Sequence, residues 1–217
     1  MENTSTLNKR ENMFRIIFYL VGLCIMGLGI ALNGISNFGA GPWDAVNIGL
    51  SYHINLSVGT CMNLVALFNL IIGGILNKEF PKVTPLITSI VLGVFIDLGF
   101  LILGGINPTT SSMEFILFLI SLPIIATGIA VYLVSNLPNT PLDYFMIAIK
   151  SKFNLSLMTG KIVSESSGLV IALLLGGPIG LGSLIIVFAI GPMMQVLHKY
   201  TTNLFNKLAL KEELVNA

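Results

Sequence analysis

The chain has 217 residues, of which 54% are hydrophobic and only 10% are charged. A typical soluble domain carries about a quarter charged residues, so this composition excludes an ordinary water-soluble globule and makes the lipid bilayer the expected partner. The net charge of +1 excludes the strongly basic surface that a nucleic-acid-binding protein needs.

Six apolar segments approach or reach the roughly 20 residues that a helix needs to cross a bilayer. In chain order they cover residues 13–35, 57–76, 84–105, 113–135, 157–176 and 181–198. We therefore expect an all-α, polytopic membrane protein with six transmembrane helices. Residues 1–12 are polar and are expected to form a disordered cytoplasmic N-terminus. Residues 199–217 alternate apolar and charged side chains, which is typical of an amphipathic helix on the membrane surface.

The lysines and arginines predict the orientation of these spans. All eleven lie before the first span, between the second and third, between the fourth and fifth, after the sixth, or in the first turns of the adjoining spans. The other connections, 36–56, 106–112 and 177–180, contain none. Because positive charge collects on the cytoplasmic side, the sequence predicts a multi-pass protein with both termini in the cytoplasm.

Shifting the sequence by 99 residues reveals an internal repeat. Twelve identities fall within residues 29–60, including Pro42-x-Asp44, which matches Pro141-x-Asp143. Chance alone would give roughly two to four. The two units, 13–105 and 113–198, hold three spans each, so the second copy is expected to enter the membrane upside down. Inverted repeats are a frequent plan of secondary transporters, and this argument from architecture makes transport a hypothesis.

A short segment follows the first span of each unit, at residues 41–54 and 140–153. Fourteen residues are too few to cross the bilayer as a helix. The proline near the start of each suits the first turn of a helix, where its missing N–H is not needed. Each segment therefore predicts a short helix, either re-entrant or interfacial. The aromatic residues of these segments, Trp43, Tyr52 and Tyr144, are typical of the belt at a membrane interface.

Three aspartates are candidate site residues. Asp44 and Asp143 lie in the first turns of the two short segments, where a carboxylate can cap the helix or line one of two opposed polar vestibules. Asp97 lies about thirteen residues into the third span, where an ionised carboxylate costs about 2.5–3.5 kcal/mol. That cost favours a solute or ion site, and the alternative is a neutral carboxyl bonded to a neighbouring helix.

Two further residues complete the candidate solute or ion site. Glu165 lies in the fifth span among small polar residues, and its counterpart in the first unit is Ala66. Gln195 is the counterpart of Asp97 when the offset is 98 residues, although it can also lie among lipid headgroups.

No catalytic, metal or cofactor site is expected. His53 and His198 stand alone on opposite sides, and the sequence contains no phosphate-binding loop. We therefore expect a protein that is not an enzyme. The leading hypothesis is a small secondary transporter of an unidentified solute, in which Asp97 and Glu165 carry protons or ions and Gln195 is a neutral partner. The alternative is a non-transporting scaffold or regulator, and a homodimer is compatible with both.

The stretch GPWDAVNIGLS at 41–51, the following NLSVGT, and Gly93-x-x-x-Asp97 resemble the YczE/YyaS/YitT group of bacterial integral membrane proteins. The second unit keeps Pro141-x-Asp143 but has no tryptophan. The resemblance implies a location in the bacterial inner membrane. It implies no particular chemistry.

Overall fold

The computed structural model describes residues 2–80, 84–138, 140–155 and 157–209, and these residues form eight α-helices and no strand. The helices are α1 (Glu2–Ser36), α2 (Pro42–Ile54), α3 (Val58–Asn77), α4 (Thr84–Leu103), α5 (Ser111–Leu133), α6 (Pro141–Phe153), α7 (Leu157–Leu174) and α8 (Leu181–Ala209). We call α1–α4 the N-terminal half and α5–α8 the C-terminal half.

Five of the helices in the described chain are long and apolar enough to cross a membrane: α1, α3, α4, α5 and α8. The remaining predicted span, 157–176, corresponds to α7, whose apolar part is the shorter helix Ile162–Leu174. Helix α1 begins at Glu2, so it includes most of the polar segment 1–12. Helix α8 continues without a break to Ala209, so the first part of the predicted surface tail extends this helix.

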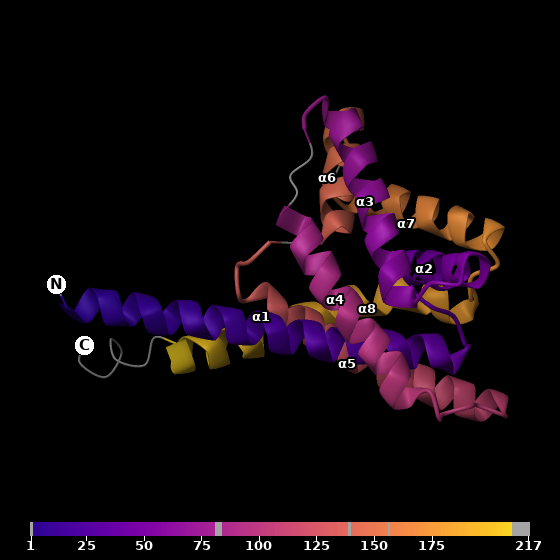
Figure 1. Ribbon diagram of the computed structural model, residues 1–217, viewed down its shortest axis with the longest axis horizontal. Coiled ribbons are helices and arrows are strands. Elements are labelled where there is room, and N and C mark those ends of the chain that lie inside the picture. The colour runs from indigo at the N-terminus through magenta and orange to yellow at the C-terminus, as the bar shows by residue number, and fades with distance from the viewer. Residues whose placement is uncertain (1, 81–83, 139, 156, 210–217) are drawn as a thin grey trace.

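The first turns of α1 and the last turns of α8 lie side by side and project together at one end of the molecule (Figure 1). The rings of Phe18 and Phe205 meet edge to face, with centroids 5.2 Å apart. The guanidinium of Arg10 donates a hydrogen bond to the Leu208 carbonyl oxygen at 3.0 Å. These contacts explain why α8 continues past its apolar segment: the added turns bury an aromatic side chain against α1.

Helices α1 and α5 form the centre of the bundle and approach each other closely through glycine. A side-chain carbon at Gly22 would overlap the backbone of Tyr132, and one at Gly128 would overlap the backbone of Met26. Small residues of this kind let helix backbones come together where lipid supplies no hydrophobic driving force.

The remaining helix contacts recur in the two halves. Helix α4 packs on α1, and α8 packs on α5. The short helix α2 contacts α7 and α3, and the short helix α6 contacts α3 and α7. One contact does not recur. Helices α3 and α4 pack on each other, whereas the described residues of their counterparts, α7 and α8, make no comparable contact.

The helix ends also recur. The hydroxyl of Ser36 donates to the carbonyl oxygen of Asn33, and that of Ser135 donates to the carbonyl oxygen of Tyr132, both at 2.6 Å. Four asparagines in the left-handed conformation follow the first two helices of each half: Asn37, Asn55, Asn136 and Asn154. Asparagine adopts this conformation more readily than most residues, so the repeated sequence accounts for the repeated turns.

The two short helices begin inside the bundle and end at its surface. In α2 the first half is buried, whereas Tyr52 and the two residues after it are exposed. In α6, Phe145 and Ile149 are buried, and the last turn is exposed. The ring of Trp43 in α2 meets the ring of Phe145 edge to face at 5.8 Å, so the two short helices contact each other.

Candidate functional site

The first turns of α2 and α6 meet at a central cavity of about 320 Å³, which we call the large lobe. Residues of α1, α2, α5, α6, α7 and α8 line it, including the carboxylates of Asp44 and Glu165. A second cavity of about 100 Å³, the small lobe, is lined by α1, α2, α3, α4 and α6. The lobes share the residues between them, which are Met26, Ile30, Trp43, Asp44, Thr140 and Leu142.

The backbone around the lobes contains two helix beginnings. Gly41 and Asp44 bound the first turn of α2, and Thr140 directly precedes α6. The first turn of a helix exposes N–H groups without intrahelical partners and carries a partial positive charge. The site therefore places side-chain oxygen atoms and backbone donors next to the same space.

Trp43 is a wall of this site and does not belong to an interfacial belt as the sequence suggested. Its side chain is only 6% exposed, and its indole N–H donates to the backbone carbonyl of Ser164 at 3.1 Å. A side-chain carbon at Gly168 would lie 2.9 Å from the indole ring. The glycine on α7 thus leaves room for the ring, and this long-range packing overrides the usual interfacial preference of tryptophan.

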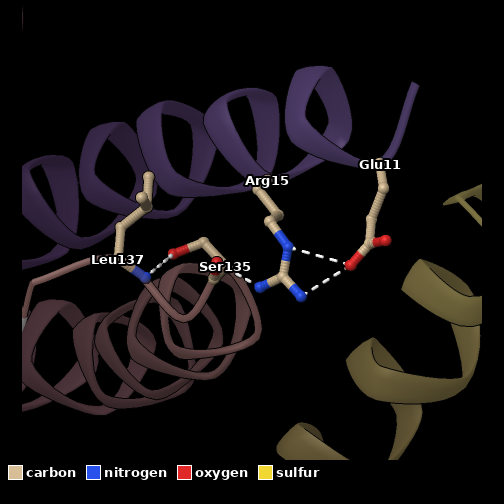
Figure 2. A network of polar contacts seen from close by, with 4 residues as sticks. All are labelled: Glu11, Arg15, Ser135 and Leu137. Carbon is tan, nitrogen blue, oxygen red and sulfur yellow. Dashed lines mark hydrogen bonds and ion pairs between the residues drawn. The ribbon is translucent and has the colours of Figure 1, made fainter. Parts of the chain in front are cut away.

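A clamp of polar contacts holds the connection that leads into α6 (Figure 2). The guanidinium of Arg15 donates to the Ser135 carbonyl oxygen at 2.8 Å and pairs with the Glu11 carboxylate at 2.7 Å. The Ser135 hydroxyl accepts a hydrogen bond from the Leu137 backbone N–H at 3.2 Å. These contacts fix residues 135–137 of the connection that leads to the first turn of α6.

A second chain of hydrogen bonds fixes the same connection from the other side. The Tyr19 hydroxyl donates to the Thr88 hydroxyl at 2.7 Å, which donates in turn to the Pro138 carbonyl oxygen at 2.8 Å. A buried carbonyl without a partner costs about 1–3 kcal/mol, so this pairing stabilises one conformation of the connection.

Asp44 and Glu165 are the predicted site residues that the structure brings together. Both line the large lobe, one from α2 and the other from α7, and their carboxyl groups interact electrostatically. Their sequence separation is 121 residues, so only the packing of α2 on α7 creates the pair. Two carboxyl groups that border one cavity favour the binding of a cation there.

Asp97 lies apart from this pair and does not line either lobe. Its carboxylate accepts a hydrogen bond from the Ser57 hydroxyl at 2.5 Å and another from the Gly59 backbone N–H at 2.7 Å. It therefore caps the beginning of α3 from α4, which is a structural position. Its cost in the apolar layer is offset by these two charge-assisted bonds.

The other two predicted residues also lie outside the described pair. Gln195 is exposed on α8, although its neighbours Gly191 and Met194 line the large lobe. Asp143 belongs to the first turn of α6, and its side chain lies outside the described residues.

Three polar residues of the site were not predicted as ligands. Asn47, Asn69 and Ser164 are 5%, 3% and 2% exposed, and among the described residues no partner bonds Asn47 Oδ1, Asn69 Oδ1 or Ser164 Oγ. The asparagines line the small lobe, and Ser164 lines the large one. The spacing of Asp44 and Asn47, three residues apart on one helix face, was a usable signal. Asn69 had no such signal in the sequence, because it lies on α3 and only the packing of that helix places it at the site.

A third cavity, a groove of about 710 Å³, adjoins the site on the side of the Lys- and Arg-containing connections. It is lined by the starts of α4 and α6 and by the end of α5. Leu133 and Thr140 line both this groove and the large lobe. These two residues therefore stand between the groove and the acidic pair.

The connection before α2, on the opposite side, is covered by the loop between α7 and α8. The Ala40 backbone N–H donates to the Pro178 carbonyl oxygen at 2.9 Å, and the Gly182 N–H donates to the Phe38 carbonyl oxygen at 3.2 Å. Within the described chain, no group of three or more His, Cys, Asp or Glu residues is arranged to hold a metal ion.

Five helices that are long and apolar enough to cross a membrane define a polytopic integral membrane protein. The chain belongs to a family of unknown function, DUF6198, which matches residues 13–199. It is 32% identical over 183 residues to the "Uncharacterized protein YyaS" of Bacillus subtilis, an alignment that covers 84% of this chain and 91% of that protein. It is 29% identical over 188 residues to the "Uncharacterized membrane protein YczE" of the same organism, with 86% of each chain covered.

A further relative is an "Uncharacterized protein" of Haemophilus influenzae, 29% identical over 180 residues, which are 83% of this chain and 81% of that protein. These similarities confirm the resemblance to YyaS and YczE that the sequence motifs indicated. No solved structure matches the chain.

Proposed function

We propose that this protein is a small secondary transporter of an unidentified solute, with the solute site in the two lobes between its halves. One observation carries the proposal: the first turns of both short helices and the carboxylates of Asp44 and Glu165 meet at one cavity. Interrupted helices that meet at a central site are the usual construction of secondary transporters.

The repeated contacts support a duplicated unit. Each half has a long helix at the centre, a short helix that begins inside the bundle, and two further helices, and the short helix of each half contacts the third helix of both halves. In the proposed topology α7 is the fifth span and brings the total to six, and three spans per unit place the second unit upside down. The distribution of lysine and arginine then puts both termini in the cytoplasm of a bacterial cell.

The groove beside Leu133 and Thr140 supports a route to the site. In the proposed topology this groove faces the cytoplasm, and the opposite connection is covered by the α7–α8 loop. The arrangement thus corresponds to an inward-facing state, from which a rocking motion of the halves would expose the site to the other side.

The proposal includes coupling of transport to protons. The geometry favours Asp44, and not Asp97, as the residue that carries protons together with Glu165. Both carboxyl groups border the solute space, whereas Asp97 is engaged in capping α3. A proton and a cationic solute would compete for the same pair, which is a simple physical basis for exchange.

Labelling from both sides of the membrane tests the proposal without knowledge of the solute. In a background with Cys24 and Cys61 replaced by alanine, Ser164→Cys places a thiol at the large lobe. A membrane-impermeant maleimide should modify it in right-side-out spheroplasts and in inside-out vesicles, because alternating access opens the lobe to each side in turn. Ser89→Cys is the matched control, since Ser89 is fully buried between helices and lines neither lobe.

Modification of the Ser164→Cys thiol from one side only would contradict alternating access. That result would favour the alternative, a non-transporting scaffold or regulator. Size-exclusion chromatography of each variant shows that the labelled population is folded.

A further inference from the structure

The small lobe contains more hydrogen-bond acceptors than the protein satisfies. Asn47 and Asn69 line this space and are only 5% and 3% exposed. Among the described residues neither Asn47 Oδ1 nor Asn69 Oδ1 has a hydrogen-bond partner. An orphaned buried acceptor costs about 1–3 kcal/mol, so two at one small cavity are expected to have a partner when the protein works. Asp44 adds a carboxylate to the same lobe, one helical turn before Asn47.

The missing partner is a donor that carries positive charge. Among the described residues that line the two lobes there is no lysine, arginine or histidine. An alkylammonium group has three N–H donors and no acceptor, which matches the three oxygen-bearing groups of Asp44, Asn47 and Asn69. A quaternary ammonium has no donor and would leave both amide oxygens unsatisfied.

The large lobe indicates the rest of the ligand. Apart from Asp44, Ser164, Glu165 and a few other polar groups, its walls are apolar side chains of α1, α5 and α8 and the indole of Trp43. A volume of about 320 Å³ accommodates a small organic body, and apolar walls with few polar groups are typical of sites for such ligands.

We propose that the two lobes bind a small primary ammonium ion with an apolar body. The ammonium group lies in the small lobe among Asp44, Asn47 and Asn69, and the apolar body extends along Trp43 into the large lobe. This assignment rests on the proposed function for the location of the solute site, and it names the class of solute.

Trp43 is the only tryptophan in the chain, so its fluorescence reports directly on the site. The purified full-length protein in detergent is titrated at neutral pH with four probes that share a four-carbon chain and differ in the polar group: n-butylamine, butan-1-ol, butyltrimethylammonium and butyrate. We expect a saturable change in Trp43 emission with n-butylamine, and an affinity at least about tenfold weaker for each of the other three probes.

Two variants connect this response to the small lobe. Asn69→Leu keeps the side-chain volume and removes the acceptor, and Asp44→Asn removes the charge; each should weaken n-butylamine binding at least about tenfold. Asn63→Ala is the matched control, because Asn63 lies on the same helix, bonds Ser89 and lines neither lobe. It should leave the affinity for n-butylamine unchanged. Thermal unfolding of each variant in the same detergent confirms that the titrated protein is folded.

The assignment is overturned by equal responses to n-butylamine and butan-1-ol, by tighter binding of butyltrimethylammonium or butyrate, or by no saturable response in folded protein. The last result would mean that water satisfies the buried oxygens. Binding of n-butylamine together with one-sided labelling of Ser164→Cys would support the site and defeat transport. Labelling of Ser164→Cys from both sides without binding of n-butylamine would support transport and defeat the assignment of the ammonium site.

Discussion

The helix pairs α3–α4 and α7–α8 hold equivalent places in the repeated sequence, and they pack very differently. In the first pair the backbones touch, since a side-chain carbon at Gly93 would lie 2.7 Å from the Gly59 carbonyl oxygen. The Ser89 hydroxyl donates to Asn63 Oδ1 at 2.7 Å and joins the same two helices. In the second pair the counterpart of Gly93 is Gly191, and no neighbouring atom of the described residues lies within 4 Å of a side-chain carbon placed there.

The sequence gives a physical reason for the difference. The counterparts of Gly59 and Asn63 in the second unit are Met158 and Ile162, so α7 has neither the small residue nor the amide that close the first pair. Residues of both α7 and α8 line the large lobe instead. Helix pairs at matching places in the two halves therefore pack closely in one half and border a cavity in the other, and the sequences of the two pairs differ at the residues that make the close contact.

Alanine at the two equivalent glycines is the strongest way to break the comparison. Gly93→Ala should lower the free energy of unfolding by about 2–3 kcal/mol, because its methyl group meets the Gly59 carbonyl and α4 must move away. Gly191→Ala, its matched control, should have almost no effect. Thermal unfolding of the two variants in detergent measures both, and similar losses of stability would refute the difference between the pairs.

The capping carboxylate sharpens the comparison next. Asp97→Ala should lower the free energy of unfolding by about 2 kcal/mol, because the Gly59 N–H and the Ser57 hydroxyl lose their acceptor. Gln195→Ala at the equivalent place should change stability little, since Gln195 is exposed on α8. Denaturant titration in detergent compares the two. An unchanged stability of Asp97→Ala would show that the carboxylate does not hold α3 and α4 together.

The smallest expected effect concerns the bond between Asn63 and Ser89. Asn63→Ala should cost about 1 kcal/mol, because the Ser89 hydroxyl loses its acceptor while little apolar contact is removed. Ile162→Ala at the equivalent place on α7 removes a side chain that is 49% exposed, so a smaller change is expected. Thermal unfolding again gives the difference, and a larger loss in Ile162→Ala would indicate that α7 is packed more tightly than α3.

The membrane class and the places of most of the long helices followed from sequence alone. In lipid every backbone N–H and C=O must be paired within the chain, so an apolar segment of sufficient length forms a helix whatever it contacts. The left-handed conformation of Asn37 and Asn136 depends in the same way on local sequence, because asparagine adopts it more readily than most residues. The proline-started short helices were also predictable, because Pro42 and Pro141 favour a helix beginning wherever they occur.

The composition of the site depended on tertiary structure. Asp97 and Glu165 looked like equivalent buried acids, and only the packing of α2 against α7 places Asp44 beside Glu165 while Asp97 caps α3. The burial of Trp43 depends in the same way on Gly168, which is 125 residues away in the sequence. Hydropathy and helix propensity are sums over neighbours in sequence, whereas a site is made by side chains from distant segments, and its members are selected by the shapes of packed helices.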